Sequence, residues 1–389
     1  MIQNVFIIGS KGIPAAYGGF ETFVDKLTEY HSEKSSIKYH IACKSGENGD
    51  FEYHNAHCFK VRVPDIGPAQ AVYYDLKALD YCCSYIREKK IDDPIVYVLT
   101  CRIGPWAREY AGKIHRLGGK MYLNPDGHEW KRAKWSFPVR KYWKLSEKQM
   151  VKNADLVICD SKNIEKYILE AYSEYKPVAT YIAYGAEITK SNISDDDEKL
   201  LEWYSINGLT KGQYYLIVGR FVPENNFETM IREFMHSSTE KQLAIITETS
   251  RKFYDRLREK THFDIDKRIK FCGTVYDQDM LKKIRENAYG YIHGHEVGGT
   301  NPSLLEALGS TNINLLLDVG FNRECGENGA LYWTKDINSL SSLIEKADKM
   351  SEDEIHILSV NAKKRIKESY SWEHIAEKYK QVFNGEKTQ

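Results

Sequence analysis

The stretch "HGHEVGGTNPSLLEALG", residues 293–309, has the residue types of an anion-binding loop that runs into a helix. Gly298, Gly299, Thr300 and Asn301 precede a helix expected from Pro302, and the N-terminus of a helix attracts phosphate through its free N–H groups and dipole. Proline costs no amide donor in a first turn. Glu306 lies one turn into that helix, where its carboxylate can accept hydrogen bonds from two ribose hydroxyls. The alternative is a glycine turn before a core helix with an ordinary surface glutamate.

A second glycine-rich loop, "GSKGIPAAYGGFETFVDKL", follows the first apolar run of the chain. Gly9, Gly12, Gly18 and Gly19 give a loop that enters a helix near Phe20, where exposed N–H groups suit an anion or a sugar hydroxyl. Because the spacing is not G-x-G-x-x-G, a nicotinamide dinucleotide site is disfavoured. A purely structural tight turn is the alternative.

Asp126 and His128 follow the apolar run "KMYLN", at the end of a strand where open α/β sheets bind ligands. This pair could bind substrate hydroxyls or share a proton, so we take both as candidate catalytic residues. The alternative is an Asx turn beside a solvated histidine.

Basic and aromatic residues then alternate without an acidic residue from Trp130 to Lys144. This pattern suits a membrane interface or a lipid diphosphate, and it would also suit single-stranded nucleic acid. A solvated helix face is less favoured because tryptophans are costly to leave in water. The acceptor or membrane candidates are Trp130, Lys131, Arg132, Lys134 and Trp135.

Arg220 follows the apolar run "YYLIVG" and is expected at the tip of that strand. Its planar guanidinium can bind two oxygens of a diphosphate. The alternative is a surface arginine paired with Glu224.

Bulk properties limit the class of protein. The chain has 389 residues, 42% hydrophobic and 28% charged, with Lys+Arg and Asp+Glu balanced at 55 each. It is therefore expected to be globular, and one basic segment in a neutral chain does not favour a nucleic-acid partner. The 8 cysteines show no C-x-x-C spacing, which indicates buried, reduced thiols. Without a signal peptide or a run of roughly 20 apolar residues, we expect a cytoplasmic protein.

Short apolar runs alternate with helical patterns, which predicts parallel sheets covered on both faces. The acidic stretch 188–200 interrupts this alternation and is interpreted as a linker. We therefore expect two doubly wound domains, residues 1–187 and 201–371. An amphipathic helix at 372–386 is expected to pack back on the first domain.

These motifs, taken in order, resemble the GT-B glycosyltransferases of the large retaining family four. The resemblance spans nearly the whole chain and rests on "YGGFETFV", "ADLVICDS", "YLIVGRFVPENN" and "NPSLLEALG". With "NPDGHEWKRAKW" and "GHEVGGTNPSLLEALG" it narrows to the bacterial β-1,4-rhamnosyltransferases of capsule and cell-wall polysaccharide synthesis. The implied fold is two Rossmann-like domains facing a central cleft, an N-terminal acceptor domain and a C-terminal donor domain.

The resemblance also implies residue roles. Glu306 would bind the ribose, Arg220 the diphosphate, Val275 the base, and Gly18 and Gly19 the donor's phosphate and sugar. The loop from Gly298 to Asn301 would donate its backbone N–H groups to the phosphates. Asp126 and His128 would position the acceptor.

Two positions depart from the family pattern. Where the family usually has a lysine shortly after the arginine, this chain has Asn225. Where the family pairs two glutamates, the earlier position is Gly298, and Glu296, His293 and His295 lie nearby. We include Asn225 and Glu296 among the donor-site candidates, with the roles of the two histidines open.

The expected activity is transfer of L-rhamnose from dTDP-β-L-rhamnose to a sugar on undecaprenyl diphosphate, at the inner face of the cytoplasmic membrane. No metal and no further cofactor are expected. The acceptor sugar, glucose or N-acetylglucosamine, stays open. The alternatives are a sugar-nucleotide 2-epimerase on the same fold and a non-catalytic nucleotide-sugar-binding partner.

Overall fold

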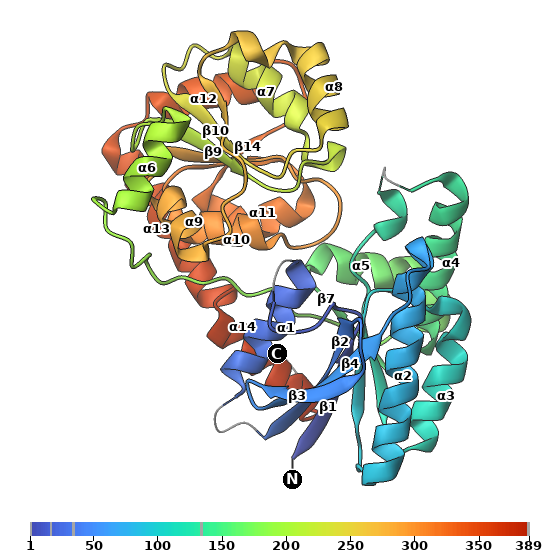
Figure 1. Cartoon of the computed structure of the whole chain (residues 1–389). Helices are drawn as coiled ribbons and strands as arrows, with labels where there is room; N and C mark the ends of the chain where they lie inside the picture. Colours follow the sequence, from blue (N-terminus) through green and yellow to red (C-terminus); the bar gives the residue numbers. More distant parts are fainter. Residues whose placement is uncertain (1, 16–17, 33–35, 133–134, 387–389) are drawn as a thin grey trace. The chain divides into compact units, whose positions relative to one another are not determined.

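The computed structural model describes residues 2–15, 18–32, 36–132 and 135–386. The chain divides into two compact units (Figure 1). The first unit combines Met1–Gly185 with Trp372–Gln389, and the second is Ala186–Ser371.

The elements alternate along most of the chain. The strands are β1 Gln3–Ile8, β2 Ile37–Ser45, β3 Gly49–Tyr53, β4 Ala56–Arg62, β5 Ile95–Leu99, β6 Lys120–Asn124, β7 Leu156–Cys159, β8 Ala179–Tyr181, β9 Tyr214–Val218, β10 Gln242–Ile246, β11 Ile269–Phe271, β12 Gly290–His293, β13 Asn314–Leu317 and β14 Leu331–Trp333. The helices are α1 Gly19–Tyr30, α2 Gln70–Lys89, α3 Ala107–Arg116, α4 Phe137–Asn153, α5 Lys162–Ala171, α6 Glu198–Asn207, α7 Phe227–His236, α8 Arg251–Thr261, α9 Gln278–Glu286, α10 Pro302–Ser310, α11 Gly320–Gly326, α12 Ser339–Asp348, α13 Glu352–Ser369 and α14 Trp372–Phe383.

The first unit contains a sheet in the order β3-β4-β2-β1-β5-β6-β7-β8. Every neighbouring pair is parallel except β3 and β4, which pair antiparallel from Gly49↔Lys60 to Tyr53↔Ala56. The prediction of a parallel sheet therefore needs a correction at this edge. The strand order reverses between β1 and β5, and ligands of doubly wound sheets bind outside the carboxyl ends of the strands at such a point.

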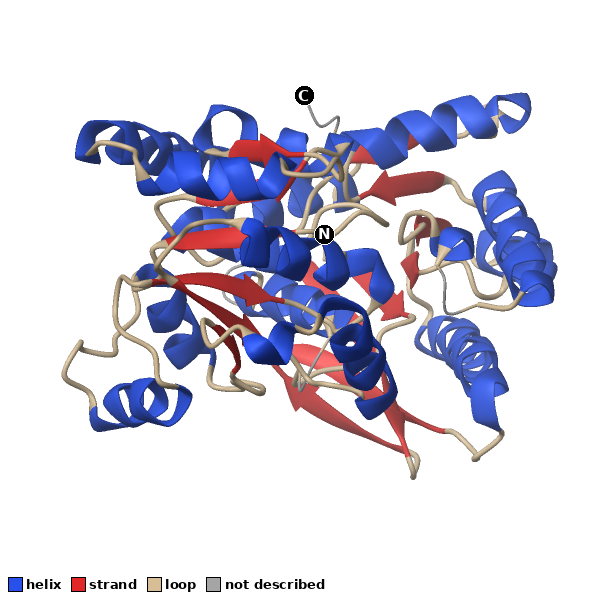
Figure 2. Cartoon of the chain, turned by 90° about the horizontal axis from the view of Figure 1, so that it is seen from above, coloured by secondary structure: helices blue, strands red, loops and turns tan. Residues whose placement is uncertain are grey.

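Helices cover both faces of this sheet (Figures 1 and 2). Buried residues of α2, α3, α4 and α5 pack on one face in a single apolar cluster. On the other face, α14 buries Trp372, Ile375, Tyr379 and Phe383, and its contacts include α1. The last helix of the chain is thus part of the first unit, because its apolar stripe completes that unit's core.

The second unit has an entirely parallel sheet in the order β11-β10-β9-β12-β13-β14. Here the order reverses between β9 and β12, so the loops after these two strands flank the ligand-binding edge. Apolar residues of α7, α8 and α12 fill one face, and those of α6, α9 and α10 fill the other. Strand β14, "LYW", was not among the predicted strands.

The stretch predicted as a linker belongs to the second unit. The backbone N–H groups of Ser191 and Asn192 donate to the carboxylates of Glu286 and Asp279, and α6 already begins at Glu198. Its acidic and polar residues therefore cap and dock this segment on α9 rather than leaving it extended.

All eight cysteines are unpaired, and all but Cys272 are buried, as their apolar sequence surroundings predict. Across the part of the chain that the structure describes, no helix is long and apolar enough to cross a membrane.

Candidate functional site

In the second unit, the motifs singled out in the sequence lie at the reversal of the strand order. Arg220 follows β9, and the loop 294–301 follows β12. Since β9 and β12 are hydrogen-bonded neighbours, both loops leave the same edge of the sheet. The structure thus places Arg220 and the glycine loop where a doubly wound domain binds its ligand.

The helix α10 begins at Pro302, as predicted. The Asn301 side chain caps it, since its Oδ1 accepts from the N–H groups of Ser303 at 2.9 Å and Leu304 at 3.4 Å. Those two donors are therefore already used. Ahead of the cap, the Glu296 N–H donates to the Glu224 carbonyl at 3.2 Å, and Gly298 has a φ of +127° that favours glycine.

Glu306 is not an isolated surface residue. Its carboxylate forms an ion pair of 2.7 Å with Arg285, whose side chain is 3% exposed whereas that of Glu306 is 32% exposed. Arg285 comes from α9 and also donates to the Ser303 hydroxyl at 3.2 Å. Arg285 was missed in the sequence because it stands mid-helix in "KKIRE" with no motif around it, yet it fixes the direction of the Glu306 carboxylate.

Arg220 is exposed and forms no ion pair with the described residues, so the alternative interpretation, a surface arginine paired with Glu224, does not hold. Its main chain is fixed instead, because Asn225 Nδ2 donates to the Arg220 carbonyl at 2.7 Å. Asn225 Oδ1 lies 2.7 Å from His295 Nδ1. One amide side chain therefore ties the loop after β9 to the loop after β12.

Glu296, the other candidate carboxylate of this loop, pairs closely with Lys335, which follows β14. His293 at the end of β12 is 5% exposed, and its Nε2 has no hydrogen-bond partner in the described part of the chain. Burial lowers the pKa of His293 to about 3, so its imidazole is neutral at physiological pH.

Thr300 is buried, and Gly299 completes the loop ahead of the cap. Val275, the candidate base contact, is half-buried against the apolar cluster beneath α6 and α9. The neighbouring Tyr276 is 70% exposed. In the turn 272–276, the Val275 side chain is therefore packed against the second unit, whereas the Tyr276 side chain is exposed to solvent.

In the first unit, the glycine loop after β1 is tightly fitted. A Cβ at Gly9, whose φ is +98°, would lie 2.1 Å from the Leu99 carbonyl oxygen of β5. Gly18 has a φ of +131°, and its Cβ would clash with the Glu21 carboxylate, whereas a Cβ at Gly19 would meet open space. Glu21 in turn accepts from the Lys11 N–H at 2.7 Å. Glycine is thus required at Gly9 by conformation and close approach together, and at Gly18 by its positive φ.

Arg102, which follows β5, is a site residue that the sequence reasoning missed. Its guanidinium donates to both oxygens of Asp75, at 3.2 and 3.0 Å, and to the Gly9 carbonyl at 3.0 Å. Asp75 is fully buried, and burial raises the pKa of its carboxyl while Arg102 opposes that shift. The only available signal was an arginine shortly after the apolar run "IVYVLT", with Cys101 between them, which is close to the signal used for Arg220.

Asp126 and His128 lie in the loop after β6. Asp126 has a φ of +54°, and its N–H donates to Asn124 Oδ1 at 2.9 Å, so the Asx-type turn of the alternative interpretation is present, whereas His128 is half-buried rather than solvated. The His128 ring packs on Tyr167 with centroids 4.2 Å apart. Burial, with help from Lys131 and Lys144, lowers the pKa of His128 to about 4. A neutral imidazole beside two cations can accept a hydrogen bond or proton from a substrate hydroxyl.

Several residues of the basic and aromatic segment form ion pairs, hydrogen bonds and cation–π contacts within the first unit. Arg132 pairs closely with the buried carboxylate of Glu129, and Trp135 Nε1 donates to the same carboxylate at 2.9 Å. Trp130 lies under the ammonium groups of Lys131 and Lys144, at 5.2 and 4.7 Å from its ring centroid. Lys134 lies outside the described residues. These contacts satisfy the Trp135 indole within the unit, whereas Trp130 Nε1 is buried without a hydrogen-bond partner among the described residues.

No group of three or more His, Cys, Asp or Glu side chains within residues 2–15, 18–32, 36–132 and 135–386 is arranged to hold a metal ion.

Comparison with known proteins shows which families and structures the chain is similar to. A family model described as a domain of unknown function, DUF1972, matches residues 2–187. An "uncharacterized glycosyltransferase" of Methanocaldococcus jannaschii is 24% identical over 389 residues, with 94% of each chain covered.

Solved structures match nearly the full length of the chain at low sequence identity. Sucrose-phosphate synthase from Thermosynechococcus elongatus superposes with a TM-score of 0.77 at 16% identity, covering 98% of each chain. An E. coli structure bound with UDP-2-fluoro glucose gives 0.74 at 12% identity and 98% coverage of each chain. An Anabaena protein in complex with UDP gives 0.73 at 12%, covering 99% of this chain and 100% of that one. The chain therefore has the α/β fold with two Rossmann-like sheets that characterises GT-B glycosyltransferases.

Proposed function

We propose that this chain is a glycosyltransferase that uses a nucleotide sugar as donor. The observation that carries the proposal is the Glu306 carboxylate, held by buried Arg285 behind a glycine loop at the strand reversal of the second unit. A fixed, partly exposed carboxylate suits the two ribose hydroxyls of a nucleotide. The loop N–H groups and Arg220 suit its diphosphate. The curated relative named as a glycosyltransferase supports the same reaction class.

More specifically, we propose that the donor is dTDP-β-L-rhamnose and the acceptor a hexose on undecaprenyl diphosphate, joined in a β-1,4 linkage with retention. This part rests on the motif resemblance. The two similar structures with a nucleotide ligand carry UDP or a UDP-sugar. The base and sugar are therefore the first variables to test.

The proposed mechanism assigns charge stabilisation to the protein and needs no metal and no further cofactor. Arg220 and the loop N–H groups stabilise the leaving diphosphate. Neutral His128 and Asp126 orient the acceptor hydroxyl, and neither attacks the sugar. The acceptor proton passes to a donor phosphate oxygen as the new bond forms on the face that the leaving group vacates, which retains configuration.

The acceptor's lipid would place the first unit at the inner face of the cytoplasmic membrane as a peripheral protein. Lys131 and Phe137 are exposed there, and Phe137 lies under the ammonium of Lys141 at 4.6 Å. An exposed ring beside cations suits a surface with anionic lipid headgroups.

A transfer assay tests the proposal directly. Purified protein is incubated with dTDP-rhamnose, UDP-glucose or UDP-N-acetylglucosamine, each with a lipid-diphosphate glucose or N-acetylglucosamine acceptor. We expect a rhamnosylated product from dTDP-rhamnose. A glucosylated product from UDP-glucose would keep the reaction class and refute the rhamnose assignment.

Two other outcomes would overturn the reaction class itself. Isomerisation of the sugar nucleotide in the absence of acceptor would indicate an epimerase. Binding of a nucleotide sugar in calorimetry, without transfer or hydrolysis for any pair, would indicate a non-catalytic partner.

A further inference from the structure

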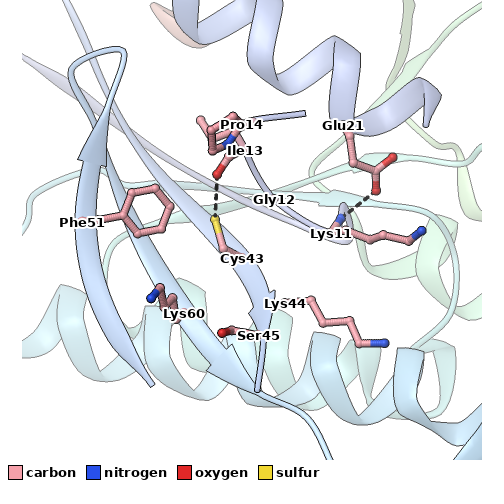
Figure 3. Close-up of a pocket in the computed structure, with 10 residues that line it drawn as sticks. All are labelled: Lys11, Gly12, Ile13, Pro14, Glu21, Cys43, Lys44, Ser45, Phe51 and Lys60. Atoms are coloured by element: carbon pink, nitrogen blue, oxygen red, sulfur yellow. Dashed lines mark hydrogen bonds between the residues drawn. The ribbon is translucent and has the colours of Figure 1, made fainter. Parts of the chain in front are cut away.

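A cavity of about 350 Å³ lies in the first unit beside the glycine loop (Figure 3). Its walls come from the loop after β1 and from strands β2, β3 and β4. Three of its lining residues are lysines, Lys11, Lys44 and Lys60. In Figure 3, Lys11 and Lys44 lie on one side of Cys43, and Phe51 and Lys60 lie on the other.

The charge of this pocket is only partly neutralised. Lys60 pairs with Glu47 at 2.6 Å, but the Glu47 side chain is 71% exposed, so solvent weakens that pair. Lys44 donates to the neutral amide oxygen of Gln70 at 2.8 Å. The Lys11 ammonium forms no ion pair or hydrogen bond with the described residues. Glu21 also lines the pocket and accepts the Lys11 backbone N–H, so three lysines face one lining carboxylate and the balance of charge is positive.

The floor of the pocket is apolar and rigid. Ile13 and Cys43 are 3% and 6% exposed, and the Cys43 thiol donates to the Ile13 carbonyl at 3.7 Å. A Cβ at Gly12 would lie 2.5 Å from the Cys43 sulfur, so glycine lets the loop close against β2. Cations around an apolar floor suit a phosphate or diphosphate group whose organic substituent packs on that floor.

The basic segment at 130–144 is a weaker candidate for the same ligand. Arg132 is neutralised by buried Glu129, and Lys144 contacts buried Glu147 together with Tyr172. Within the part of the chain that the structure describes, the lysines of the pocket contact no buried carboxylate. Positive charge is therefore more available at the pocket than at the segment that the sequence pattern favoured.

We propose that Lys11, Lys44 and Lys60 bind the phosphate or diphosphate of the acceptor substrate. This inference rests on the proposed transferase function. It assigns a binding site to the anionic group of the proposed acceptor. The group could belong to a lipid diphosphate or to a soluble sugar phosphate, and the pocket chemistry is the same for both.

A larger neighbouring cavity of about 920 Å³ also includes Lys60. It is lined by Tyr73, Tyr81 and Lys77 of α2 and by Arg62 at the end of β4. A ligand held at its phosphate by the three lysines therefore has room to continue along this edge of the sheet.

The test measures binding of inorganic diphosphate to the full chain by calorimetry, with saturating UDP or dTDP present to fill a nucleotide site. The variants are Lys11→Gln/Lys44→Gln, its Lys→Arg counterpart, and Lys166→Gln as the control. Lys166 is an exposed lysine of the same unit, 74% exposed and paired only weakly with Glu170 at 3.9 Å. We expect about a tenfold loss of affinity for each ammonium removed, retention in the arginine variant, and no change in the control. Thermal unfolding of each variant checks that the fold is intact.

Two further arms identify the source of the phosphate. Glucose 1-phosphate, and phosphatidylcholine vesicles containing undecaprenyl phosphate, are each tested against the wild type and the double variant. Lysine-dependent binding of either probe supports the proposal and names the acceptor class. Equal binding of all probes by wild type and double variant overturns it. If UDP and dTDP fail to bind the wild type, the proposed function has failed instead, and the two failures are therefore distinguishable.

Discussion

The ion pair between Arg285 and Glu306 predicts an unequal response to removal of its two partners. Arg285 is 3% exposed and Glu306 is 32% exposed. In Glu306→Gln, the buried guanidinium loses the only carboxylate that it contacts among the described residues and keeps the weaker Ser303 hydroxyl. In Arg285→Met, the carboxylate that remains can turn towards water.

Loss of one partner from a buried pair costs about 3–5 kcal/mol, mostly because the remaining charge is left without compensation. Since Gln at 306 keeps a carbonyl oxygen near Arg285, we expect the lower end, about 3 kcal/mol, for Glu306→Gln. For Arg285→Met we expect about 1 kcal/mol, because solvent reaches the remaining carboxylate.

Urea denaturation of the full chain, followed by tryptophan fluorescence, measures both changes. Nucleotide affinity, measured by calorimetry, should fall strongly in Glu306→Gln and less in Arg285→Met, since the latter keeps the carboxylate but loses its orientation. Equal stability losses, or a larger loss for Arg285→Met, would refute the reasoning. Lys166→Gln, outside both units' binding edges, is the control for charge change alone.

Three further predictions concern other buried groups. Burial lowers the pKa of His293 to about 3, below the unfolded value near 6.5, so the unfolded state binds more protons between these values. Stability should therefore fall as pH drops from about 6.5 towards 3, and His293→Phe should flatten this part of a pH series of thermal unfolding. Gly9→Ala should cost more than about 3 kcal/mol because its Cβ meets the β5 backbone, whereas Gly112→Ala in α3, with open space, should be neutral or stabilising in the same urea assay. Arg102→Met should destabilise more than Asp75→Asn, since it leaves a fully buried carboxylate without its cation, and urea midpoints would show the order.

Much of the fold follows from patterns that are local in sequence. Apolar runs such as "NVFIIG" and "YYLIVG" are buried strands, and the glycine loops after them lie where the alternation requires. Strand β3, "GDFEY", was missed because it is a half-exposed edge strand with no apolar run. Strand β14 was missed because three residues carry too short a pattern.

The candidate site was predictable only where one segment carries the whole signal. The loop 298–301 and Glu306 are close in sequence, so one motif reveals both. Arg285 and Arg102 reach their sites from other elements, and a single arginine in a helix or after a strand has no periodicity to mark it. The lysine pocket has the same character, because its three cations are far apart in sequence and meet only through strand pairing, with Lys60 opposite Cys43 in the register of β2 and β4.

The two departures from the resembled family's pattern are connected through hydrogen bonds. Asn225 stands where that family usually has a lysine. An ammonium group could not accept a hydrogen bond from His295 as the Asn225 amide oxygen does. The same amide donates to the Arg220 carbonyl, so the exchange removes a cation but fixes the loop that carries the remaining one. The Glu296 carboxylate forms an ion pair with Lys335. In the proposed donor site, the diphosphate would therefore depend on Arg220 and the loop N–H groups, and His293 and His295 lie at the end of β12 and in the loop after it, where the resembled family has its other glutamate. The proposed 6-deoxy sugar, which has one hydroxyl fewer to bind, would not need a second free carboxylate there.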